Sequence, residues 1–264
     1  MLCKHAEMTT SEELAQRLLD LHHRPNPVIL PTVWDVWSAE ACASLGFKAL
    51  TIGSHPVADS LGEADGEAMN LEDVLGVVRR ITAVLDIPVS VDLESGYDTP
   101  AGELVRRTLD AGAVGINIED TVHSMDSMRS PQEHADYISQ LRAAADAIGT
   151  HLVINGRTDA FTTDEQPETQ LEDALTRMRL LEEAGADVLY PVKVPSLDYL
   201  ERILREVKTP VNVTAHPVNG AVPDGLSLQE VSRLGVKRVS FGPLLQRSLT
   251  DAMGEILRPW TPAS

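Results

Sequence analysis

Residues 88–119 read PVSVDLESGYDTPAGELVRRTLDAGAVGINIE, and the pattern of this segment recurs along the whole chain. It opens with a short apolar run over Pro88–Asp92, continues with helical periodicity over Ala101–Ala111, and returns to an apolar run over Val114–Glu119. A strand, an amphipathic helix and a second strand in this order are typical of a parallel βαβ unit. Gly112 directly follows the helix, where glycine readily takes the left-handed conformation that ends helices.

The same alternation of apolar runs and amphipathic segments extends to both sides. Eight apolar runs predict strands at Val28–Leu30, Ala49–Ile52, Pro88–Asp92, Val114–Glu119, Leu152–Arg157, Val188–Pro191, Pro210–Thr214 and Arg238–Gly242. Helical periodicity predicts helices at Ser11–Leu21, Ser38–Leu45, Leu71–Leu85, Ala101–Ala111, Pro131–Ala147, Gln170–Ala184, Ser196–Val207, Ser227–Leu234 and Pro243–Ile256. Without a Gly-x-Gly-x-x-Gly fingerprint or a linker in mid-chain, this order predicts an α/β fold of the closed (β/α)₈ TIM-type barrel. We expect a single domain over residues 1–264, with an extra N-terminal helix and a flexible tail at residues 1–10.

Composition limits the possible partners. The chain has 264 residues and a mass of 28.7 kDa, and barrels of this type typically have roughly 250 residues. Lys plus Arg number 22 and Asp plus Glu number 40, so 22 − 40 gives a net charge of −18. This charge argues against binding to nucleic acid or to an anionic membrane surface, because both depend on Lys and Arg side chains. It does not exclude a small anionic substrate, because a metal and a few arginines can reverse the field inside a cleft.

Cysteine content and hydropathy indicate the compartment. Cys3 and Cys42 are too few for a disulfide framework, so we interpret them as a free tail thiol and a core thiol. No stretch approaches the ~18 apolar residues of a membrane span, and residues 1–10 lack the apolar segment of a secretory signal. We therefore expect a cytoplasmic protein.

Acidic side chains concentrate where the third and fourth predicted strands end. In a (β/α)₈ barrel the active site lies at the carboxyl ends of the strands, and Asp92, Glu94, Glu119 and Asp120 fall there. Crowded carboxylates repel each other unless a cation neutralises them, and Mg²⁺ with one or two direct carboxylate ligands suits this role. The alternative interpretation is that these side chains cap helices and pair with arginines.

Residues that could bind an anion end other strands. Arg157 ends the fifth strand and can hold a carboxylate or phosphonate through two parallel hydrogen bonds. Its alternative role is an ion pair with Asp159 or Glu119. Gly53-Ser54-His55 follows the second strand and could present backbone N–H groups to an anion. The remaining strand-end candidates for the substrate site are Trp34, Asn212 and His216.

The other histidines receive structural interpretations. We expect His22 and His23, near the end of the first helix, to be solvated. We expect His123 and His134 to lie in or beside the long loop after the fourth strand. No serine or cysteine has the sequence context of a catalytic nucleophile.

Six pieces of the chain together resemble the isocitrate lyase/phosphoenolpyruvate mutase superfamily. In chain order they are Val33-Trp34-Asp35 with Ser38-Ala39, Ser60-Leu61-Gly62 with Asp65-Gly66, Val91-Asp92-Leu93-Glu94-Ser95-Gly96-Tyr97, Ile118-Glu119-Asp120, Gly156-Arg157-Thr158-Asp159-Ala160 and Glu183-Ala184-Gly185-Ala186-Asp187. They follow the order of the family, and the resemblance covers nearly the whole chain. Each piece alone is common, but their combination is specific.

The resemblance implies a (β/α)₈ barrel, a bound Mg²⁺ or Mn²⁺, and a small anionic α-oxo acid that reacts through a metal-stabilised enolpyruvate. By position it assigns Asp92, Glu94 and Glu119 to the metal site, with Glu94 standing where relatives commonly have Asp. Such an enzyme places a cation beside the keto oxygen that gains negative charge as the neighbouring bond breaks.

The resemblance also assigns residues to the substrate. Arg157 matches the arginine that holds the substrate anion, and Asp65 matches the acidic residue after the Leu-Gly loop. We therefore expect Arg157, Asp65 and Glu94 to take part in catalysis. Gly53, Ser54 and His55 occupy the loop whose backbone amides hold the substrate in relatives.

Departures from the family occur in the loop after Glu119-Asp120. The segment Thr121–Ser130 contains no cysteine, which argues against isocitrate and methylisocitrate lyase activity, and Thr121 replaces the lysine of phosphoenolpyruvate mutases. Our leading hypothesis is therefore an Mg²⁺-dependent enzyme that cleaves or rearranges a C–C or P–C bond of a small α-oxo acid. Phosphoenolpyruvate mutase or phosphonopyruvate hydrolase activity is the alternative, and a non-catalytic barrel that binds a carboxylate is a second alternative.

Two further expectations concern motion and assembly. The segment Thr121–Ser130 is longer than the usual ~2–6 residues of such a connection, so we expect it to be a mobile gate. The resemblance implies a homodimer or homotetramer in which C-terminal helices are exchanged. Little chain follows the helix at Pro243–Ile256, and Pro259 and Pro262 would break a further helix, which argues against a full swapped helix pair.

Overall fold

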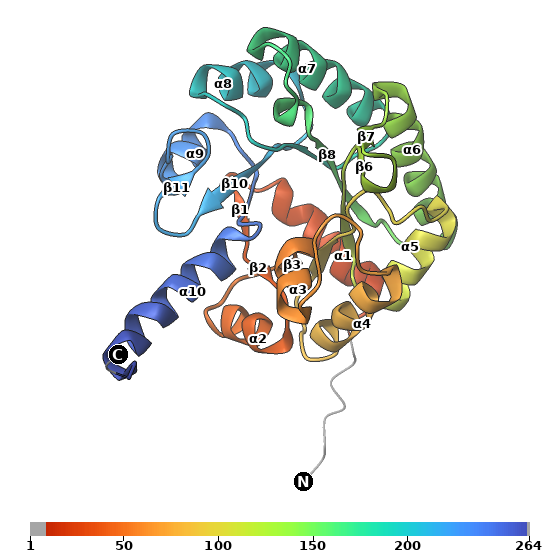
Figure 1. Ribbon diagram of the computed structural model, residues 1–264. Coiled ribbons are helices and arrows are strands. Elements are labelled where there is room, and N and C mark those ends of the chain that lie inside the picture. Colours follow the sequence, from red (N-terminus) through yellow and green to blue (C-terminus); the bar gives the residue numbers. More distant parts are fainter. Residues whose placement is uncertain (1–8, 263–264) are drawn as a thin grey trace.

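The computed structural model describes residues 9–262, and its parallel strands close into a barrel (Figure 1). Residues 1–8 of the predicted tail, with Cys3, lie outside the described residues. One sheet contains, in spatial order, β2 (Thr32–Val33), β3 (Leu50–Ile52), β4 (Val89–Asp92), β5 (Gly115–Ile118), β8 (Val153–Thr158) and β9 (Val188–Pro191). A second contains β1 (Val28–Leu30), β12 (Arg238–Ser240), β10 (Asn212–His216) and the antiparallel β11 (Gly220–Ala221).

Two junctions join these sheets into one ring. The first strand is interrupted at Pro31, so that β1 pairs with β12 and β2 pairs with β3. On the opposite side, a parallel bridge between Leu189 and Val211 joins β9 to β10. The eight strand positions predicted from the sequence are therefore confirmed as the eight positions of a TIM-type barrel.

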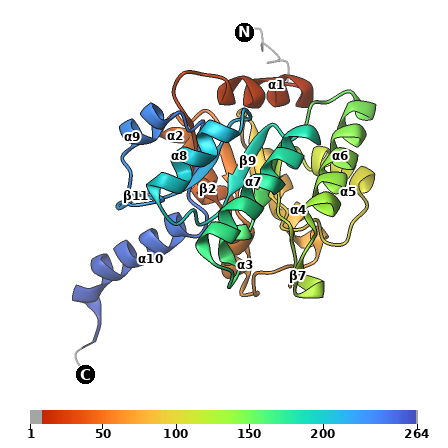
Figure 2. The ribbon, with the colours of Figure 1, turned by 90° about the horizontal axis from the view of Figure 1, so that it is seen from above.

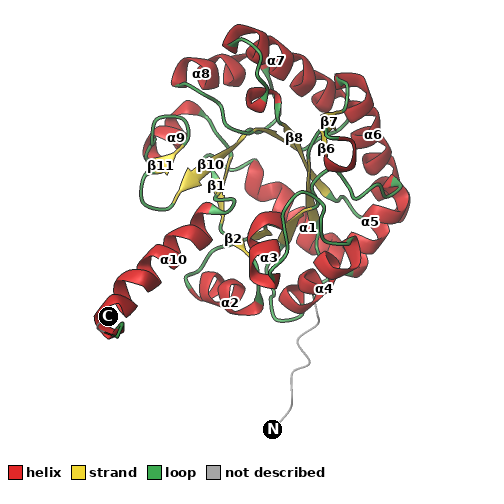
Figure 3. Ribbon diagram, viewed as in Figure 1, coloured by secondary structure: helices red, strands yellow, loops and turns green. Residues whose placement is uncertain are grey.

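Helices surround the ring and alternate with its strands (Figures 1 and 3). They are α2 (Val36–Ser44), α3 (Ser54–Leu61), α4 (Leu71–Thr82), α5 (Ala101–Asp110), α6 (Pro131–Ile148), α7 (Pro167–Glu183), α8 (Leu197–Glu206), α9 (Leu228–Leu234) and α10 (Leu244–Leu257). The predicted extra helix, α1 (Ser11–His22), lies across one end of the barrel, opposite α3 (Figure 2). Its apolar face packs on the amino ends of the strands, in a cluster of Ala15, Leu18, Leu21, Val28, Leu30, Ala49, Val114, Val153 and Val188. The carboxyl ends of the strands are left for a site.

The segment 88–119 folds as the βαβ unit that its sequence predicts. β4 and β5 pair in parallel, with Asp92 beside Asn117, and α5 connects them. Gly112 has a φ of +87°, and a Cβ there would lie 2.6 Å from the Thr82 hydroxyl oxygen. That hydroxyl donates to the carbonyl of Ala111 at 2.7 Å, so glycine allows both the turn and this close approach.

Three local features differ from expectation. α3 follows Gly53 directly, so the predicted loop at Ser54 and His55 is the first turn of a helix. His22 is fully buried, not solvated: its Nδ1 contacts the Leu18 carbonyl at 2.8 Å, and burial lowers its pKa to about 3. Within Thr121–Ser130, β6 (Thr121–Val122) and β7 (Ser127–Met128) form a small hairpin around a 3₁₀ turn.

The described residues contain no helix long and apolar enough to cross a membrane. The cytoplasmic location stays a prediction.

Candidate active site

A cavity of about 490 Å³ opens where the barrel strands end at their carboxyl termini. The predicted site residues among its lining are Gly53, Ser54, His55, Asp65, Asp92 and Arg157. Glu94 and Glu119 are not among the lining residues but contact two of them: the Glu94 N–H donates to Asp92, and Glu119 pairs with Arg157. The structure therefore brings most of the predicted site together.

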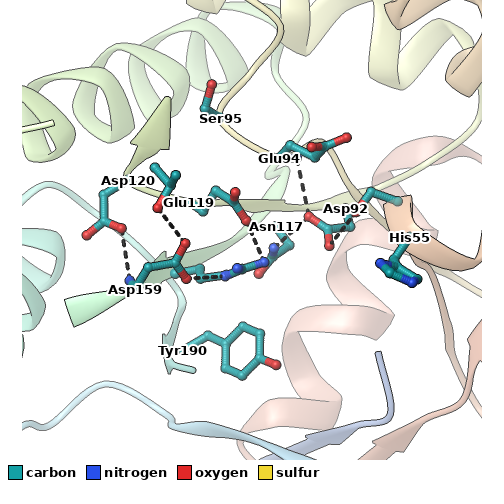
Figure 4. Close-up of polar contacts among 12 residues, drawn as sticks. His55, Asp92, Glu94, Ser95, Asn117, Glu119, Asp120, Asp159 and Tyr190 are labelled. Atoms are coloured by element: carbon teal, nitrogen blue, oxygen red, sulfur yellow. Dashed lines mark hydrogen bonds and ion pairs between the residues drawn. The ribbon is translucent and has the colours of Figure 1, made fainter. Parts of the chain in front are cut away.

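Asp92 ends β4 and its carboxylate lies at one side of the cavity (Figure 4). Oδ1 accepts a hydrogen bond from Asn117 Nδ2 at 2.8 Å, and Oδ2 accepts one from the Ser54 hydroxyl at 3.3 Å. Burial raises the pKa of Asp92, while the Arg157 charge and the Asn117 hydrogen bond oppose this rise. A buried carboxylate of this kind would be stabilised by a cation.

Glu94 lies in a turn with left-handed backbone after β4. Its φ is +48° and that of Tyr97 is +54°, a conformation that residues with side chains seldom take. Glu67 holds this turn, because one carboxylate oxygen accepts hydrogen bonds from the Ser95 N–H, the Ser95 hydroxyl and the Tyr97 N–H. The Glu94 carboxylate accepts from the Tyr97 hydroxyl at 2.8 Å and from the Glu67 N–H at 2.6 Å. Burial raises the pKa of Glu94 to about 7.

Glu119 and Arg157 form a buried ion pair beside the cavity. Glu119 Oε2 lies 2.5 Å from Arg157 Nη1, and Glu119 Oε1 lies 2.7 Å from His123 Nε2. Arg157 Nε pairs with Asp159 Oδ1 at 2.7 Å, so both ion pairs considered for Arg157 exist, although the side chain also lines the cavity. Burial raises the pKa of Glu119, and the hydrogen bond that His123 donates to the Glu119 carboxylate raises the pKa of His123 to about 9.

Asp120 contacts Asp159, one of the two carboxylates that pair with Arg157. Its Oδ1 accepts the Asp159 N–H at 2.9 Å and its Oδ2 pairs with Arg177 Nη1 at 3.1 Å. The Thr121 hydroxyl donates to the other Asp159 oxygen at 2.6 Å. Asp120 therefore follows the alternative interpretation, a carboxylate paired with an arginine, and its contacts fix the position of Asp159 and through it that of Arg157.

The first turn of α3 faces the cavity. Gly53 packs so closely that a Cβ would lie 2.6 Å from Thr32 Cγ2 and 2.9 Å from Pro56 Cγ. The first N–H groups of a helix have no intrahelical partner, so those of Ser54 and His55 are available to an anion. Nδ1 of His55 lies 2.9 Å from Oδ2 of Asp65, so these two predicted site residues contact each other.

Three predicted substrate residues are not among the lining of the cavity. Trp34 is buried in the apolar core, next to the first turn of α2. Asn212 lies fully buried inside the barrel and donates to the Ser240 hydroxyl at 3.1 Å. His216 Nδ1 accepts the N–H groups of Val218 and Asn219, which closes the turn after β10. Trp34 and His216 lie at carboxyl ends of strands as expected, whereas Asn212 is the first residue of β10 and so lies at the amino end of that strand. The contacts of all three direct their side chains away from the cavity.

Several lining residues were not predicted from the sequence. They include Asn117, Asn155, Tyr190, Arg238 and Arg247. The period-two alternation of β8 could have identified Asn155, since it shares a face with Arg157, and Asn117 pairs with Asn155 in the register of β5 and β8. His123 was expected in or beside the loop, but nothing in the sequence indicated that it would contact Glu119 and Glu94.

The acidic side chains at and beside the cavity determine how a divalent cation would bind. Within residues 9–262, no group of three or more His, Cys, Asp or Glu side chains is arranged to hold a metal. Tyr97 donates to Glu94, while His123 and Arg157 pair with Glu119, so these contacts compete with a metal for both carboxylates. Asp92 alone among the three lines the cavity. Mg²⁺ commonly keeps several waters and binds through one or two carboxylates, so these residues fit a magnesium with Asp92 as its direct ligand.

Known proteins resemble this chain along most of its length. Residues 18–260 match the family model of phosphoenolpyruvate phosphomutase. The chain is 32% identical to 2-methylisocitrate lyase of Escherichia coli over 67% of this chain and 61% of that protein, and 27% identical to oxaloacetate decarboxylase of Paraburkholderia xenovorans over 93% and 82%. A solved structure of a candidate phosphonomutase from Burkholderia cenocepacia superposes with a TM-score of 0.84 and 33% identity, over 93% of this chain and 99% of the other. The chain therefore belongs to the phosphoenolpyruvate mutase/isocitrate lyase superfamily of lyases and mutases.

Proposed function

We propose that this protein is an Mg²⁺-dependent enzyme that cleaves or rearranges a C–C or P–C bond of a small α-oxo acid, with pyruvate enolate as the departing or transferred fragment. Members of the superfamily perform C–C and P–C bond chemistry on α-oxo acids. The observation that carries the proposal here is the single cavity lined by Asp92, Arg157 and the first turn of α3. It brings one acidic group, one guanidinium and two backbone N–H groups to the same space.

Arg157 and α3 would bind and orient the substrate. Glu119 and Asp159 hold Arg157 Nη1 and Nε, and the structure gives Nη2 no partner among the described residues. A guanidinium fixed at two nitrogens is preorganised to donate from the third. The N–H groups of Ser54 and His55 would donate to an oxygen that gains negative charge, aided by the positive end of the α3 dipole.

Asp92 would hold the divalent cation, with Glu94 and Glu119 reached through water. When bound, the cation supplies positive charge beside the keto oxygen, where negative charge develops in the transition state. The chain itself keeps Asp92 in place through Asn117 and Ser54. Tyr97 keeps the Glu94 carboxylate in its buried position.

The segment Thr121–Ser130 favours simple cleavage over the reactions of the better known relatives. It contains no cysteine that could act as a thiol acid, although one relative is a 2-methylisocitrate lyase. Thr121 instead donates to Asp159, which is a structural contact. Decarboxylation of a β-carboxy α-oxo acid is our leading reaction, and another relative is an oxaloacetate decarboxylase. Cleavage of phosphonopyruvate remains the alternative, favoured by the resemblance to a phosphonomutase candidate.

A turnover panel tests the proposal. Purified protein is incubated with Mg²⁺ and with oxaloacetate, phosphonopyruvate or 2-methylisocitrate, and the formation of pyruvate, phosphate and phosphoenolpyruvate is measured, with EDTA and enzyme-free Mg²⁺ as controls. Pyruvate formed from oxaloacetate above the enzyme-free rate supports decarboxylation. Pyruvate with phosphate from phosphonopyruvate supports P–C cleavage, and phosphoenolpyruvate from phosphonopyruvate supports rearrangement. No Mg²⁺-dependent turnover of any α-oxo acid would contradict the proposal.

The proposal includes a homodimer or homotetramer assembled through α10. This helix has no buried residue and projects away from the barrel (Figure 1). Its exposed large apolar residues, and one just beyond it, recur at helical spacing: Leu249, Met253, Ile256, Leu257 and Trp260. A second copy of α10 would cover this stripe. In sedimentation velocity, Met253→Glu should lower the oligomeric state, while Asp251→Lys on the opposite face should not. A parent chain that sediments as a monomer would exclude this assembly.

A further inference from the structure

Arg238 is a buried arginine without a partner. It lies in β12 with 1% of its surface exposed, and its Nε and Nη1 have no hydrogen-bond partner within residues 9–262. Other arginines with largely buried side chains differ, because Arg142, Arg157 and Arg177 each pair with at least one carboxylate. Burial lowers the pKa of Arg238 to about 10, so the group is still cationic at neutral pH.

The surroundings of Arg238 do not supply an anion. Asp92 lines the same cavity, but its carboxylate accepts hydrogen bonds from Asn117, Ser54 and the Glu94 N–H. Asn212 bonds to Ser240, and Tyr190 bonds to Thr214. His22, whose Nε2 also lacks a partner among the described residues, supplies no negative charge, and burial lowers its pKa to about 3. Burying an unpaired charge is unfavourable by several kcal/mol even after relaxation, so its retention suggests a partner that arrives from outside.

The cavity gives that partner a place and a charge. Arg238 lines the cavity. It is the first residue of β12, so its side chain enters the cavity from deeper in the barrel than the strand-end residues. Of the charged lining residues, Arg157, Lys193, Arg238 and Arg247 are basic, and Asp65 and Asp92 are acidic. In a chain of net charge −18 this local excess favours an anionic occupant.

We infer that Arg238 binds a second anionic group of the substrate, a carboxylate or a phosphonate, so that a dianionic ligand is held between Arg157 and Arg238. This inference rests on the proposed function and deepens it, because it assigns the choice between monoanionic and dianionic oxo acids to one residue. Water alone could accept hydrogen bonds from Arg238, but it would leave the charge uncompensated. An anion in the cavity compensates the charge and accepts from the guanidinium, as in charge-assisted guanidinium pairs.

Binding without turnover tests the inference. Titration calorimetry is performed with malonate and phosphonoacetate, which carry two anionic groups, and with pyruvate, which carries one. Arg238→Met should weaken the binding of at least one dianion by about tenfold or more, the value of one charge-assisted hydrogen bond, and change pyruvate binding less than about twofold. The dianion that loses more affinity identifies the group as carboxylate or phosphonate. Arg247→Met, which removes the same charge from an exposed lining residue, should leave the preference for dianions intact.

Stability separates a binding role from a structural one. Ligand-free Arg238→Met should unfold at the same or a higher temperature than the parent, because an unpaired buried charge has been removed. Equal dianion binding by parent and Arg238→Met, or equal losses for dianions and pyruvate, would overturn the inference. If Arg238→Met does not fold, Arg238→Lys should still weaken dianion binding by about threefold or more, since lysine lacks the planar fork, and unchanged binding would overturn it. A chain that binds dianions through Arg238 yet turns over no oxo acid would refute the proposed function and leave this inference standing.

Discussion

Replacing Arg157 with lysine keeps the positive charge but removes the planar fork of the guanidinium. In the parent, Nη1 and Nε are held by Glu119 at 2.5 Å and by Asp159 at 2.7 Å, on a side chain that lines the cavity. The single ammonium of lysine cannot pair with both carboxylates and also face a ligand. We therefore expect Arg157→Lys to lose activity and some stability together.

The size of both losses follows from these contacts. Glu119 is 3% exposed and Arg157 is 22% exposed, so solvent screens their interaction only weakly. Losing one charge-assisted hydrogen bond to the substrate would raise the barrier by about 1.5–3 kcal/mol, which lowers kcat/KM by about 10- to 150-fold. Leaving one buried carboxylate poorly paired should lower the free energy of unfolding by about 1–3 kcal/mol.

Steady-state kinetics and urea unfolding measure the two effects separately. Arg142→Lys is the matched control, because Arg142 pairs with the buried Asp187 at 2.5 Å and is not a lining residue of the cavity. The control should lose stability and keep its kcat/KM within about twofold. If Arg157→Lys behaves like this control, Arg157 is a structural ion pair and its assignment to the substrate is refuted.

Three other predictions concern the metal, pH and the loop. Asp92→Ala should lower kcat/KM by about a hundredfold or more and raise the Mg²⁺ concentration needed for activity, without loss of stability; unchanged turnover at limiting Mg²⁺ would remove Asp92 from the metal site. Burial raises the pKa of Glu94 from 4.5 to about 7, so the folded chain holds that proton more tightly than the unfolded chain, and the metal-free protein should lose stability as pH rises through this interval. Between pH 5 and pH 8, the free energy of unfolding measured in urea should fall by about 1–3 kcal/mol less for Glu94→Gln than for the parent. An equal fall in both proteins would show that Glu94 titrates normally. Cleavage of Thr121–Ser130 by protease should slow when Mg²⁺ and oxalate are both bound, and equal cleavage rates with bound oxalate would contradict the predicted gate.

The barrel could be predicted because its strands are continuous apolar runs. Parallel strands buried on both faces read this way, and each predicted run contains one strand position of the ring. The observed strand ends differ from the predicted ones by a residue or two. For example, the run predicted at Pro210–Thr214 forms a strand at Asn212–His216, because hydrogen bonds to the neighbouring strands determine where a strand ends. α3 was not predicted, although Gly53 at its N-cap and Pro56 in its first turn are both compatible with a helix start, because its eight residues give only a weak periodic signal.

Strand ends supply most of the site residues that could be predicted, and the resemblance to the family added Asp65 beyond α3. Asp92 and Arg157 end strands and line the cavity, as expected. Trp34 also follows a strand, but the hydrogen bond from its N–H to Ser38 belongs to a helix cap, and its ring joins the core. His123 and Arg238 were not identified, because the contacts of His123 depend on how its loop folds back and Arg238 lies at the start of its strand.

A crystal structure of the protein with Mn²⁺ and oxalate tests the candidate site most directly, since oxalate mimics the enolate and Mn²⁺ can be located by its anomalous scattering. The proposed function predicts Mn²⁺ in the cavity bound to the Asp92 carboxylate. It also predicts oxalate oxygens within hydrogen-bond distance of the Arg157 guanidinium and of the backbone N–H groups of Ser54 and His55. Oxalate or Mn²⁺ bound elsewhere, with Asp92 and Arg157 keeping only the contacts that they have in the ligand-free chain, would contradict it.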